Sequence, residues 1–303
     1  MASPNLVKAM PAKGNNMEFL ISFVNGLGVG GVYAMIALGY TMVYGIAKML
    51  NFAHGDIIMV GGYTIVLFFA VNPVVATLAS IVFCVILGIT IEKLAYKPLR
   101  GSSPLAVLIT AIGVSYLLQS VALMLTKGNT KMLNLTLGTI TAGGFYVKWS
   151  TIITVICTVA IMVSLTLFVK KTRTGRAMVA VSEDKAAAQL MGINVNFIIM
   201  ITFAIGSALA ALAAFCYLLA TPSVTPTMGA IPGIKAFTAA VIGGIGSIPG
   251  AMLGGILLGL VESFSLAIPQ VSAYTEAIEF SLLIIILLVK PTGILGKKRR
   301  EKV

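Results

Sequence analysis

The sequence has 303 residues, of which 58% are hydrophobic and 10% are charged, and its formal net charge is +12. Soluble domains carry about 25% charged residues, so this composition excludes a soluble globular protein. The basic residues lie in short loops and near the ends, as the positive-inside rule expects for a membrane protein, and not along a face suited to nucleic acid. We therefore expect an all-α polytopic membrane protein with lipid, and not nucleic acid, around it.

Long apolar runs predict the membrane spans. A helix needs about 20 apolar residues to cross roughly 30 Å of hydrocarbon. The expected spans are, in chain order, 19–44, 57–71, 74–93, 105–125, 150–169, 197–219 and 271–289. A broken or re-entrant segment at 236–264 brings the number to about eight, in a single transmembrane domain over 1–303. The N-terminal residues show no cleavable signal pattern.

Segment 236–264 is as apolar as a membrane span but contains helix-breaking residues in its middle. These are Gly243, Gly244, Gly246, Pro249 and Gly250. Proline removes a backbone donor and glycine weakens a helix. Within hydrocarbon, such a break is tolerated only where it is buried in protein or lines a cavity, and transporters place breaks near the substrate path. The alternative is a tight turn between two helices that small residues allow to pack closely.

The distribution of charge predicts the orientation of the chain. The loop at 170–185 and the tail at 297–302 each hold five basic residues, so both are expected in the cytoplasm. Segment 236–264 must then cross an even number of times, as two short helices or as a re-entrant hairpin. The same reasoning places 97–104 and 51–56 inside and the N-terminus outside.

Residues 173–196 predict a short cytoplasmic helix of roughly nine residues. Ser182 is a suitable N-cap, Glu183 and Asp184 are acids for the first turn, and Gly192 supplies the C-cap. An isolated helix of this length is marginal in water. It needs a surface to pack on, which is either a cytosolic partner or, alternatively, the chain's own loops or the membrane.

The sequence contains no motif that indicates catalysis. It has no phosphate-binding G-x-x-x-x-G-K-[ST] loop, no nucleophile elbow and a single histidine. Its three cysteines lie in apolar runs without metal-ligand spacing. We expect no enzymatic activity, no metal and no cofactor.

The polar cluster N-F-A-H-G-D at 51–56 stands between two apolar runs. Ionisable groups inside membranes are functional candidates by default, so His54 and Asp56 could serve a proton-coupled carrier. The alternative is that Asn51, His54 and Asp56 cap helix ends or act in gating, and this interpretation is favoured.

Four charged residues lie in or beside apolar segments. Lys235 either receives a substrate carboxylate or extends to the membrane interface, and the second interpretation is slightly favoured. Glu262 is expected to face the bundle interior or to lie near enough to the interface to stay wet. Glu276 and Glu279 are expected to be solvated near the outer end of the last span.

Five co-linear motifs together resemble a known family. They are G-Y-T-M-V-Y-G at 39–45, N-F-A-H-G-D at 51–56, S-E-D-x-x-A-A-x-L-M-G-I-N at 182–194, G-I-K-A-F-T-A-A-V-I-G-G-I-G-S-I-P-G-A at 233–251 and P-T-G-I-L-G at 291–296. The chain is similar over nearly its whole length to the LivH-type permease of bacterial branched-chain amino-acid ABC importers. The N-terminal extension at 1–16 is longer and more basic than the family pattern.

The resemblance implies a permease of the bacterial plasma membrane that works with a second related permease, two cytosolic ATPases and an external substrate-binding protein. It implies that 173–196 is the loop that docks into a groove on the ATPase. The coupling residues are then Glu183, Asp184, Ala187, Ala188, Gly192 and Ile193. The residues of the path or gate are Asn51, His54, Gly55, Asp56, Lys235, Gly243, Gly244, Gly246, Pro249 and Gly250.

Three alternatives stay open at this stage. Permeases for urea, short amides or other amino acids share the scaffold. A proton-coupled secondary carrier is a second possibility, although such a carrier has no use for an ATPase-docking helix. The third is a structural membrane subunit without a path.

Overall fold

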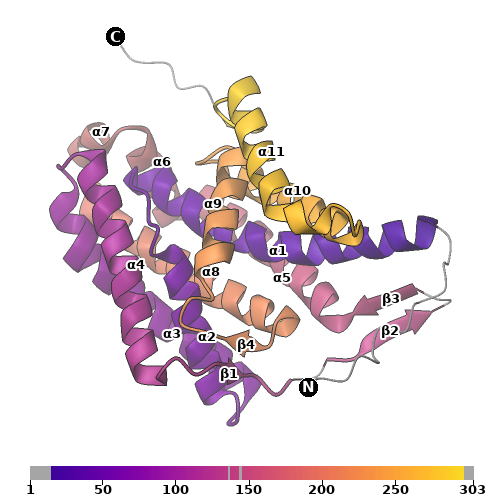
Figure 1. The fold of residues 1–303 in the computed structure, drawn as a ribbon. Coiled ribbons are helices and arrows are strands. Elements are labelled where there is room, and N and C mark those ends of the chain that lie inside the picture. Colours follow the sequence, from indigo (N-terminus) through magenta and orange to yellow (C-terminus); the bar gives the residue numbers. More distant parts are fainter. Residues whose placement is uncertain (1–14, 136, 143–144, 297–303) are drawn as a thin grey trace.

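The computed structural model describes residues 15–135, 137–142 and 145–296, and it is almost entirely helical (Figure 1). The N-terminal extension up to residue 14 and the basic tail at 297–303 lie outside the described residues. The helices are α1 (Asn15–Ala47), α2 (His54–Phe68), α3 (Pro73–Ile91), α4 (Pro104–Thr126), α5 (Trp149–Lys171), α6 (Arg173–Glu183), α7 (Lys185–Leu190), α8 (Val195–Ala220), α9 (Ala230–Gly243), α10 (Ile248–Ala267) and α11 (Thr275–Val289).

Seven helical stretches within the described ranges are long and apolar enough to cross a membrane. They contain α1, α3, α4, α5, α8, α10 and α11, and the expected fold class of an all-α polytopic membrane protein is confirmed. Two further apolar helices, α2 and α9, have only 15 and 14 residues. At about 1.5 Å per residue they fall short of the hydrocarbon thickness. The expected span at 57–71 is therefore a short helix.

Local sequence signals fix several of the helix ends. Asn72 caps α3, because its side chain accepts a hydrogen bond of 2.8 Å from the Val74 N–H, and Pro73 occupies the first turn. Ser103 and Pro104 begin α4 in the same way. At its far end α3 continues as a π-helical turn, η1 (Glu92–Tyr96), and a 3₁₀ turn, η2 (Lys97–Leu99).

Short strands interrupt the stretch between α4 and α5, which the sequence predicts as a polar loop. Strand β2 (Thr139–Ala142) pairs antiparallel with β3 (Phe145–Lys148), and β1 (Lys131–Met132) pairs antiparallel with β4 (Ser223–Val224). The β-branched and aromatic residues of T-I-T-A and F-Y-V-K favour this extended conformation.

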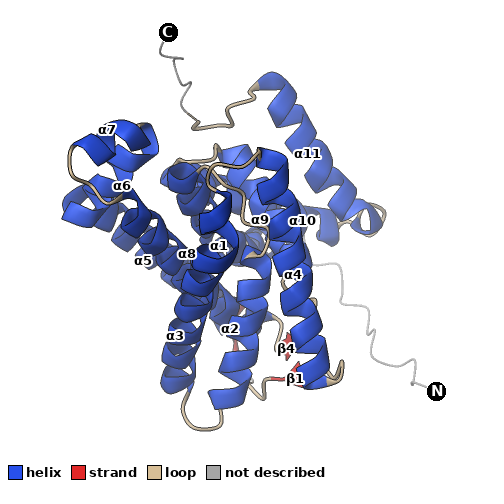
Figure 2. Ribbon diagram, turned by 90° about the vertical axis from the view of Figure 1, so that its left-hand side faces the viewer, coloured by secondary structure: helices blue, strands red, loops and turns tan. Residues whose placement is uncertain are grey.

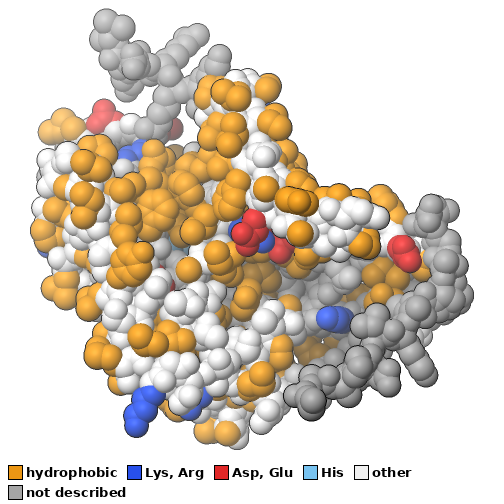
Figure 3. Space-filling view, in the orientation of Figure 1, with side chains coloured by type: hydrophobic (Ala, Val, Ile, Leu, Met, Phe, Trp, Pro, Cys, Tyr) orange, Lys and Arg blue, Asp and Glu red, His pale blue; other side chains and the backbone are white. Residues whose placement is uncertain are grey.

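Helix α1 runs through the middle of the bundle, where residues 32–38 are buried. The small-xxx-small spacing of Gly26 and Gly30 faces the same spacing in α10. A Cβ on Gly30 would lie 2.7 Å from the Ile256 Cα, and one on Gly259 would lie 2.2 Å from the Gly30 backbone N. Glycines on both helices thus bring the α1 and α10 backbones into contact. On the face shown in Figure 3, apolar side chains are widespread and charged side chains are few, as suits a lipid-facing exterior.

The two sides of the bundle differ. Helices α6 and α7 and the C-terminal end of α11 lie on one side, which we call the α7 side, and β1 and β4 lie on the opposite, strand side (Figures 1 and 2). The basic loop at 170–185 therefore shares a side with the end of the last span, as the parity argument predicts. The positive-inside rule predicts that the α7 side faces the cytoplasm.

Candidate translocation path and docking helix

The glycine-rich break lies between α9 and α10 on the α7 side. Gly244 and Gly246 have φ values of 104° and 97°, a conformation that glycine adopts without a Cβ penalty. Ser247 then caps α10 by accepting a 3.2 Å hydrogen bond from the Gly250 N–H. The predicted reversal between two helices is confirmed, although α10, at 20 residues, is not short.

Backbone contacts hold this reversal together. A Cβ on Gly243 would lie 1.9 Å from the Gly250 carbonyl oxygen, and one on Gly254 would lie 2.0 Å from the Ala239 carbonyl oxygen. The P-T-G-I-L-G segment closes the end of α9. The N–H groups of Ile294 and Leu295 donate to the carbonyls of Ile242 and Gly243 at 2.8 and 2.9 Å. These glycines therefore allow close packing of α9 and α10. Close packing was one of the two interpretations of segment 236–264, and a role in the path was the other.

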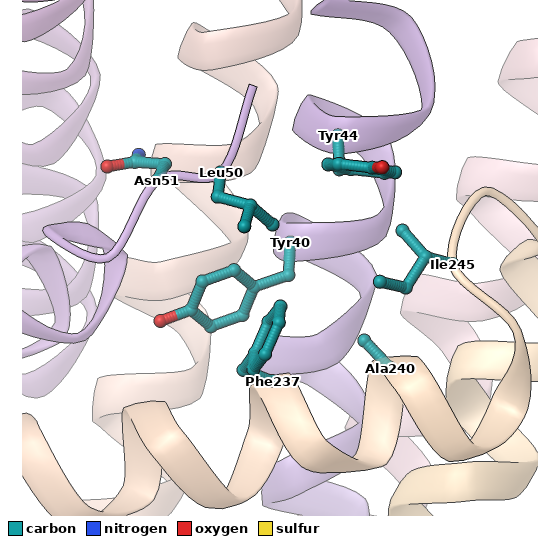
Figure 4. A pocket seen from close by; sticks show the side chains of 7 residues that line it. All are labelled: Tyr40, Tyr44, Leu50, Asn51, Phe237, Ala240 and Ile245. Atoms are coloured by element: carbon teal, nitrogen blue, oxygen red, sulfur yellow. The ribbon is translucent and has the colours of Figure 1, made fainter. Parts of the chain in front are cut away.

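The break also borders a group of aromatic side chains at the α7-side end of α1 (Figure 4). A gap of about 10 Å³ is left there, room for about one water molecule. Its lining residues are Tyr40, Tyr44, Leu50, Asn51, Phe237, Ala240 and Ile245. The Phe237 ring lies 5.8 Å from the Tyr40 ring and 5.4 Å from the Phe52 ring, centroid to centroid. We call Tyr40, Phe52 and Phe237 the aromatic seal.

The N-F-A-H-G-D cluster joins the start of α2 to three other elements. The Asn51 side chain accepts a 2.9 Å hydrogen bond from the Tyr96 hydroxyl. The His54 ring stands edge-on to the Tyr40 ring, with 4.8 Å between centroids. Asp56 accepts a 2.9 Å hydrogen bond from Gln119 on α4. Asn51, His54 and Asp56 are all buried.

The predicted capping role of these side chains is wrong for α2. Its N-cap is Ala53, without a side-chain cap hydrogen bond, and His54 and Asp56 already belong to the first turn. Their polar groups bond or pack between helices instead. Gly39 of α1 makes room for His54, since a Cβ there would lie 2.3 Å from the histidine Nε2.

Gly55 allows the two short helices to meet at their N-terminal ends. A Cβ on Gly55 would lie 2.4 Å from the Gly229 carbonyl oxygen and 3.4 Å from the Gly233 Cα. Helix α9 begins at Ala230, so this contact joins the beginnings of α2 and α9 inside the protein. Membrane transporters use such interrupted helices where polar backbone is shielded by protein or faces a cavity.

Lys235 belongs to a buried group of three charges. Its Nζ lies 3.1 Å from a Glu262 carboxylate oxygen and 3.2 Å from one of Glu279, and 5.9 Å from the centroid of the Tyr33 ring. We call Lys235, Glu262 and Glu279 the ion trio. The expectation that Lys235 extends to the interface is wrong, because its side chain is only 7% exposed and finds its partners inside.

The expectation that Glu279 is solvated is also wrong, because its side chain is only 1% exposed. Glu276, in contrast, is exposed as expected. Glu262 faces the interior as predicted. The sequence does contain a signal for the ion trio, because one lysine and two glutamates lie in three separate apolar segments. An ionised group in such a segment needs a counter-ion, so these three residues could have been predicted to pair.

A cavity of about 520 Å³ opens on the strand side, and Lys235 and Glu262 belong to its wall. Helix α1, the first turns of α5, the end of α8 and the start of α9 supply the other walls. Its volume lies within the range of about 300–1,000 Å³ typical of small-molecule sites. We call it the strand-side cavity. Of the predicted path residues, only Lys235 lines it.

The helix predicted from Glu183 to Gly192 is the shorter α7, and a second helix, α6, precedes it and ends at Glu183. Ser182 lies within α6, where its hydroxyl donates to the Val179 carbonyl, so it is not an N-cap. Asp184 is the N-cap of α7, accepting hydrogen bonds from the Ala186 and Ala187 N–H groups at 2.9 and 3.0 Å. Glu183 ends α6. Asp184 has extended backbone dihedrals and breaks the helix there.

The end of α7 follows the prediction. Gly192 has a φ of 79°, the Ile193 N–H donates to the Ala188 carbonyl, and the Gly192 N–H donates to the Gln189 carbonyl. These bonds form a Schellman motif. Ala188 is buried against its own protein, whereas Leu190 and Met191 are 89% and 82% exposed. The helix thus packs on the chain with one face and presents an apolar tip.

Lys185 connects α7 to the central helix. Its Nζ donates a 2.9 Å hydrogen bond to the carbonyl of Ala47, and Ala47 is the last residue of α1. Burial lowers the pKa of Lys185, and the positive charge of Arg100 lowers it further. A cation at a helix C-terminus interacts favourably with the orphan carbonyls there. No local pattern predicts this contact, because the two residues are 138 positions apart.

Comparison with known proteins identifies the family. A family model described as the branched-chain amino acid transport system permease component matches residues 22–287. The chain belongs to this permease family. It is 44% identical to the high-affinity branched-chain amino acid transport system permease protein BraD of Pseudomonas aeruginosa, over 94% of this chain and 98% of BraD. It is 41% identical to LivH of Escherichia coli K12, over 95% of this chain and 98% of LivH.

The family extends to more distant permeases. A probable branched-chain amino acid transport permease protein LivH of Methanocaldococcus jannaschii is 28% identical over 86% of this chain and 88% of its own length. The resemblance inferred from five motifs is thus confirmed over nearly the whole sequence. As a family member with seven candidate spans in its described part, the chain is a multi-pass membrane permease.

Proposed function

We propose that this chain is the permease subunit of an ATP-driven importer for branched-chain or similar apolar amino acids in a bacterial plasma membrane. The observation that carries the proposal is the similarity to BraD and LivH over nearly the full length of all three chains. An external binding protein delivers the substrate to the strand side. A second related permease and two cytosolic ATPases complete the complex.

The arrangement of cavity and seal supports a path along α1 and α9. Lys235 is the last residue of α9 that lines the strand-side cavity, and Phe237 of the aromatic seal follows two residues later, on the opposite face of α9. A substrate in the cavity would meet closed packing toward the α7 side. Such an arrangement would suit an alternating-access transporter that is open toward the outside.

The exposed tip of α7 supports an ATPase-docking role for 173–196. Leu190 and Met191 would enter a groove on the ATPase, while Glu183, Asp184, Ala187, Gly192 and Ile193 shape the docking loop and Ala188 anchors it to the bundle. Movement of the ATPases would reach α1 through the Lys185 contact with Ala47. Helix α1 would then loosen the aromatic seal, with Asn51, His54, Gly55 and Asp56 guiding the start of α2.

The test is uptake of labelled leucine into proteoliposomes that contain the permease pair, the two ATPases and the binding protein. We expect uptake that requires ATP hydrolysis and survives collapse of the proton gradient. Uptake that continues without ATP hydrolysis and stops when the gradient collapses would establish the carrier alternative. A complex that transports urea or amides but not leucine would place the chain with another substrate.

A further inference from the structure

We infer that the ion trio is a binding site for the backbone of a zwitterionic α-amino acid at the wall of the strand-side cavity. The ammonium group of the ligand pairs with Glu262 and its carboxylate pairs with Lys235. This inference rests on the proposed function and names, within the permease itself, the chemistry that the transported molecule must carry.

The trio has the charges that such a ligand needs. It contains two carboxylates for one ammonium group, with Lys235 3.1 Å from Glu262 and 3.2 Å from Glu279. Among the described residues, one carboxylate oxygen of Glu262 and one of Glu279 are buried without a hydrogen-bond partner. A buried acceptor without a donor is costly, so the site has unused capacity for an N–H donor.

Geometry separates the roles of the two glutamates. Lys235 and Glu262 line the cavity, and Glu262 is 15% exposed. Glu279 is 1% exposed. A ligand can therefore separate Lys235 from Glu262 while Lys235 keeps Glu279. Every charge is then paired in the complex, which avoids the penalty of an isolated buried ion.

The rest of the cavity suits an apolar side chain. Val29 and Val32 of α1 and Ile231 of α9 line it, while Thr151 and Thr154 add polar groups from α5. An uncharged molecule such as urea has no charge to offer either partner of the opened ion pair. The site therefore favours apolar amino acids over urea and short amides, which the sequence alone could not separate.

The first experiment measures binding of labelled leucine to the wild-type complex of permeases and ATPases without its binding protein. The competitors are leucine, leucinamide, which lacks the carboxylate, 4-methylpentanoate, which lacks the ammonium group, and urea. A hydrogen bond to a charged group contributes enough for about a tenfold loss when it is missing. We expect each analogue to compete at least about tenfold more weakly than leucine, and urea not at all. Equal competition by leucinamide or 4-methylpentanoate would overturn the site.

The second experiment compares Glu262→Gln with Glu276→Gln, a matched control at an exposed position of α11. Leucine binding should fall about tenfold in the first variant and stay unchanged in the second. Unchanged binding in a correctly assembled Glu262→Gln complex would refute the assignment. If that variant does not assemble, the analogue series decides alone. Uptake driven by the binding protein is measured in parallel, so that a complex with uptake but without this binding refutes the site and not the proposed function.

Discussion

The two halves of this permease are built in different ways. The strand-side half is hollow, and its cavity of about 520 Å³ is bordered by two members of the ion trio. The α7-side half has aromatic side chains around a gap of about 10 Å³ and glycine contacts between α9 and α10. Helix α9 takes part in both halves. Its Lys235 lines the cavity, and its Phe237, two residues later, belongs to the aromatic seal. The open half carries the ion trio at its cavity wall, whereas aromatic side chains and glycine contacts pack the other half.

The strand-side half should depend on charge balance. Lys235→Met leaves two buried carboxylates without a counter-ion, and removing one partner of a buried ion pair destabilises by about 3–5 kcal/mol. We expect a large drop in the thermal unfolding temperature of the purified complex. Adding Glu279→Gln to that variant should restore part of the loss, because one surplus charge is removed. An unchanged unfolding temperature for Lys235→Met alone would show that Lys235 does not stabilise the two buried carboxylates.

The α7-side half should depend on backbone contact. Gly254→Ala places a Cβ where the Ala239 carbonyl oxygen lies 2.0 Å away, and overpacking of this kind costs about 1–3 kcal/mol. The control is Gly113→Ala on α4, whose Cβ would meet no atom within 4 Å. Alanine favours a helix over glycine, so the control should be neutral or slightly stabilising. Equal unfolding temperatures for the two variants would contradict the contact between α9 and α10.

The start of α7 gives a smaller, local effect. Asp184→Ala removes the N-cap and should destabilise α7 by about 1 kcal/mol. We expect faster amide hydrogen exchange at Ala186 and Ala187, while the exchange of α1 stays unchanged. Ser182→Ala is the control, since Ser182 lies within α6 and the N-cap of α7 is Asp184. Faster exchange of these amides in Ser182→Ala but not in Asp184→Ala would show that Ser182 is the N-cap of α7.

Glu183→Lys should have the smallest effect on folding. The side chain is exposed at the end of α6, and such surface substitutions usually stay within about 0.5 kcal/mol. In the docking model the reversed charge weakens ATPase association and leucine uptake. Co-purification of the ATPases with tagged permease measures the first effect directly. Normal co-purification and uptake would remove Glu183 from the docking loop.

Much of the fold follows from the sequence because hydrocarbon imposes long apolar runs with clear ends. Asn72–Pro73 and the break after Gly243 were readable for that reason. The division at Asp184 was not, since Ser182, Glu183 and Asp184 all suit a helix start. The ion trio and the contact between Lys185 and Ala47 join residues far apart in the chain, and local patterns do not specify such partners.

In the proposed function, ATP binding closes the strand side and α7 transmits the movement. Spin labels at Lys148→Cys and Thr227→Cys would stand on two walls of the strand-side cavity, in a Cys157→Ser background to avoid labelling the half-buried native thiol. The distance between the labels is measured in the reconstituted complex without nucleotide and with ATP held by a hydrolysis-deficient ATPase. We predict that ATP shortens it, and that Glu183→Lys abolishes the change. An identical distance in both states, in a complex that transports leucine, would contradict the account.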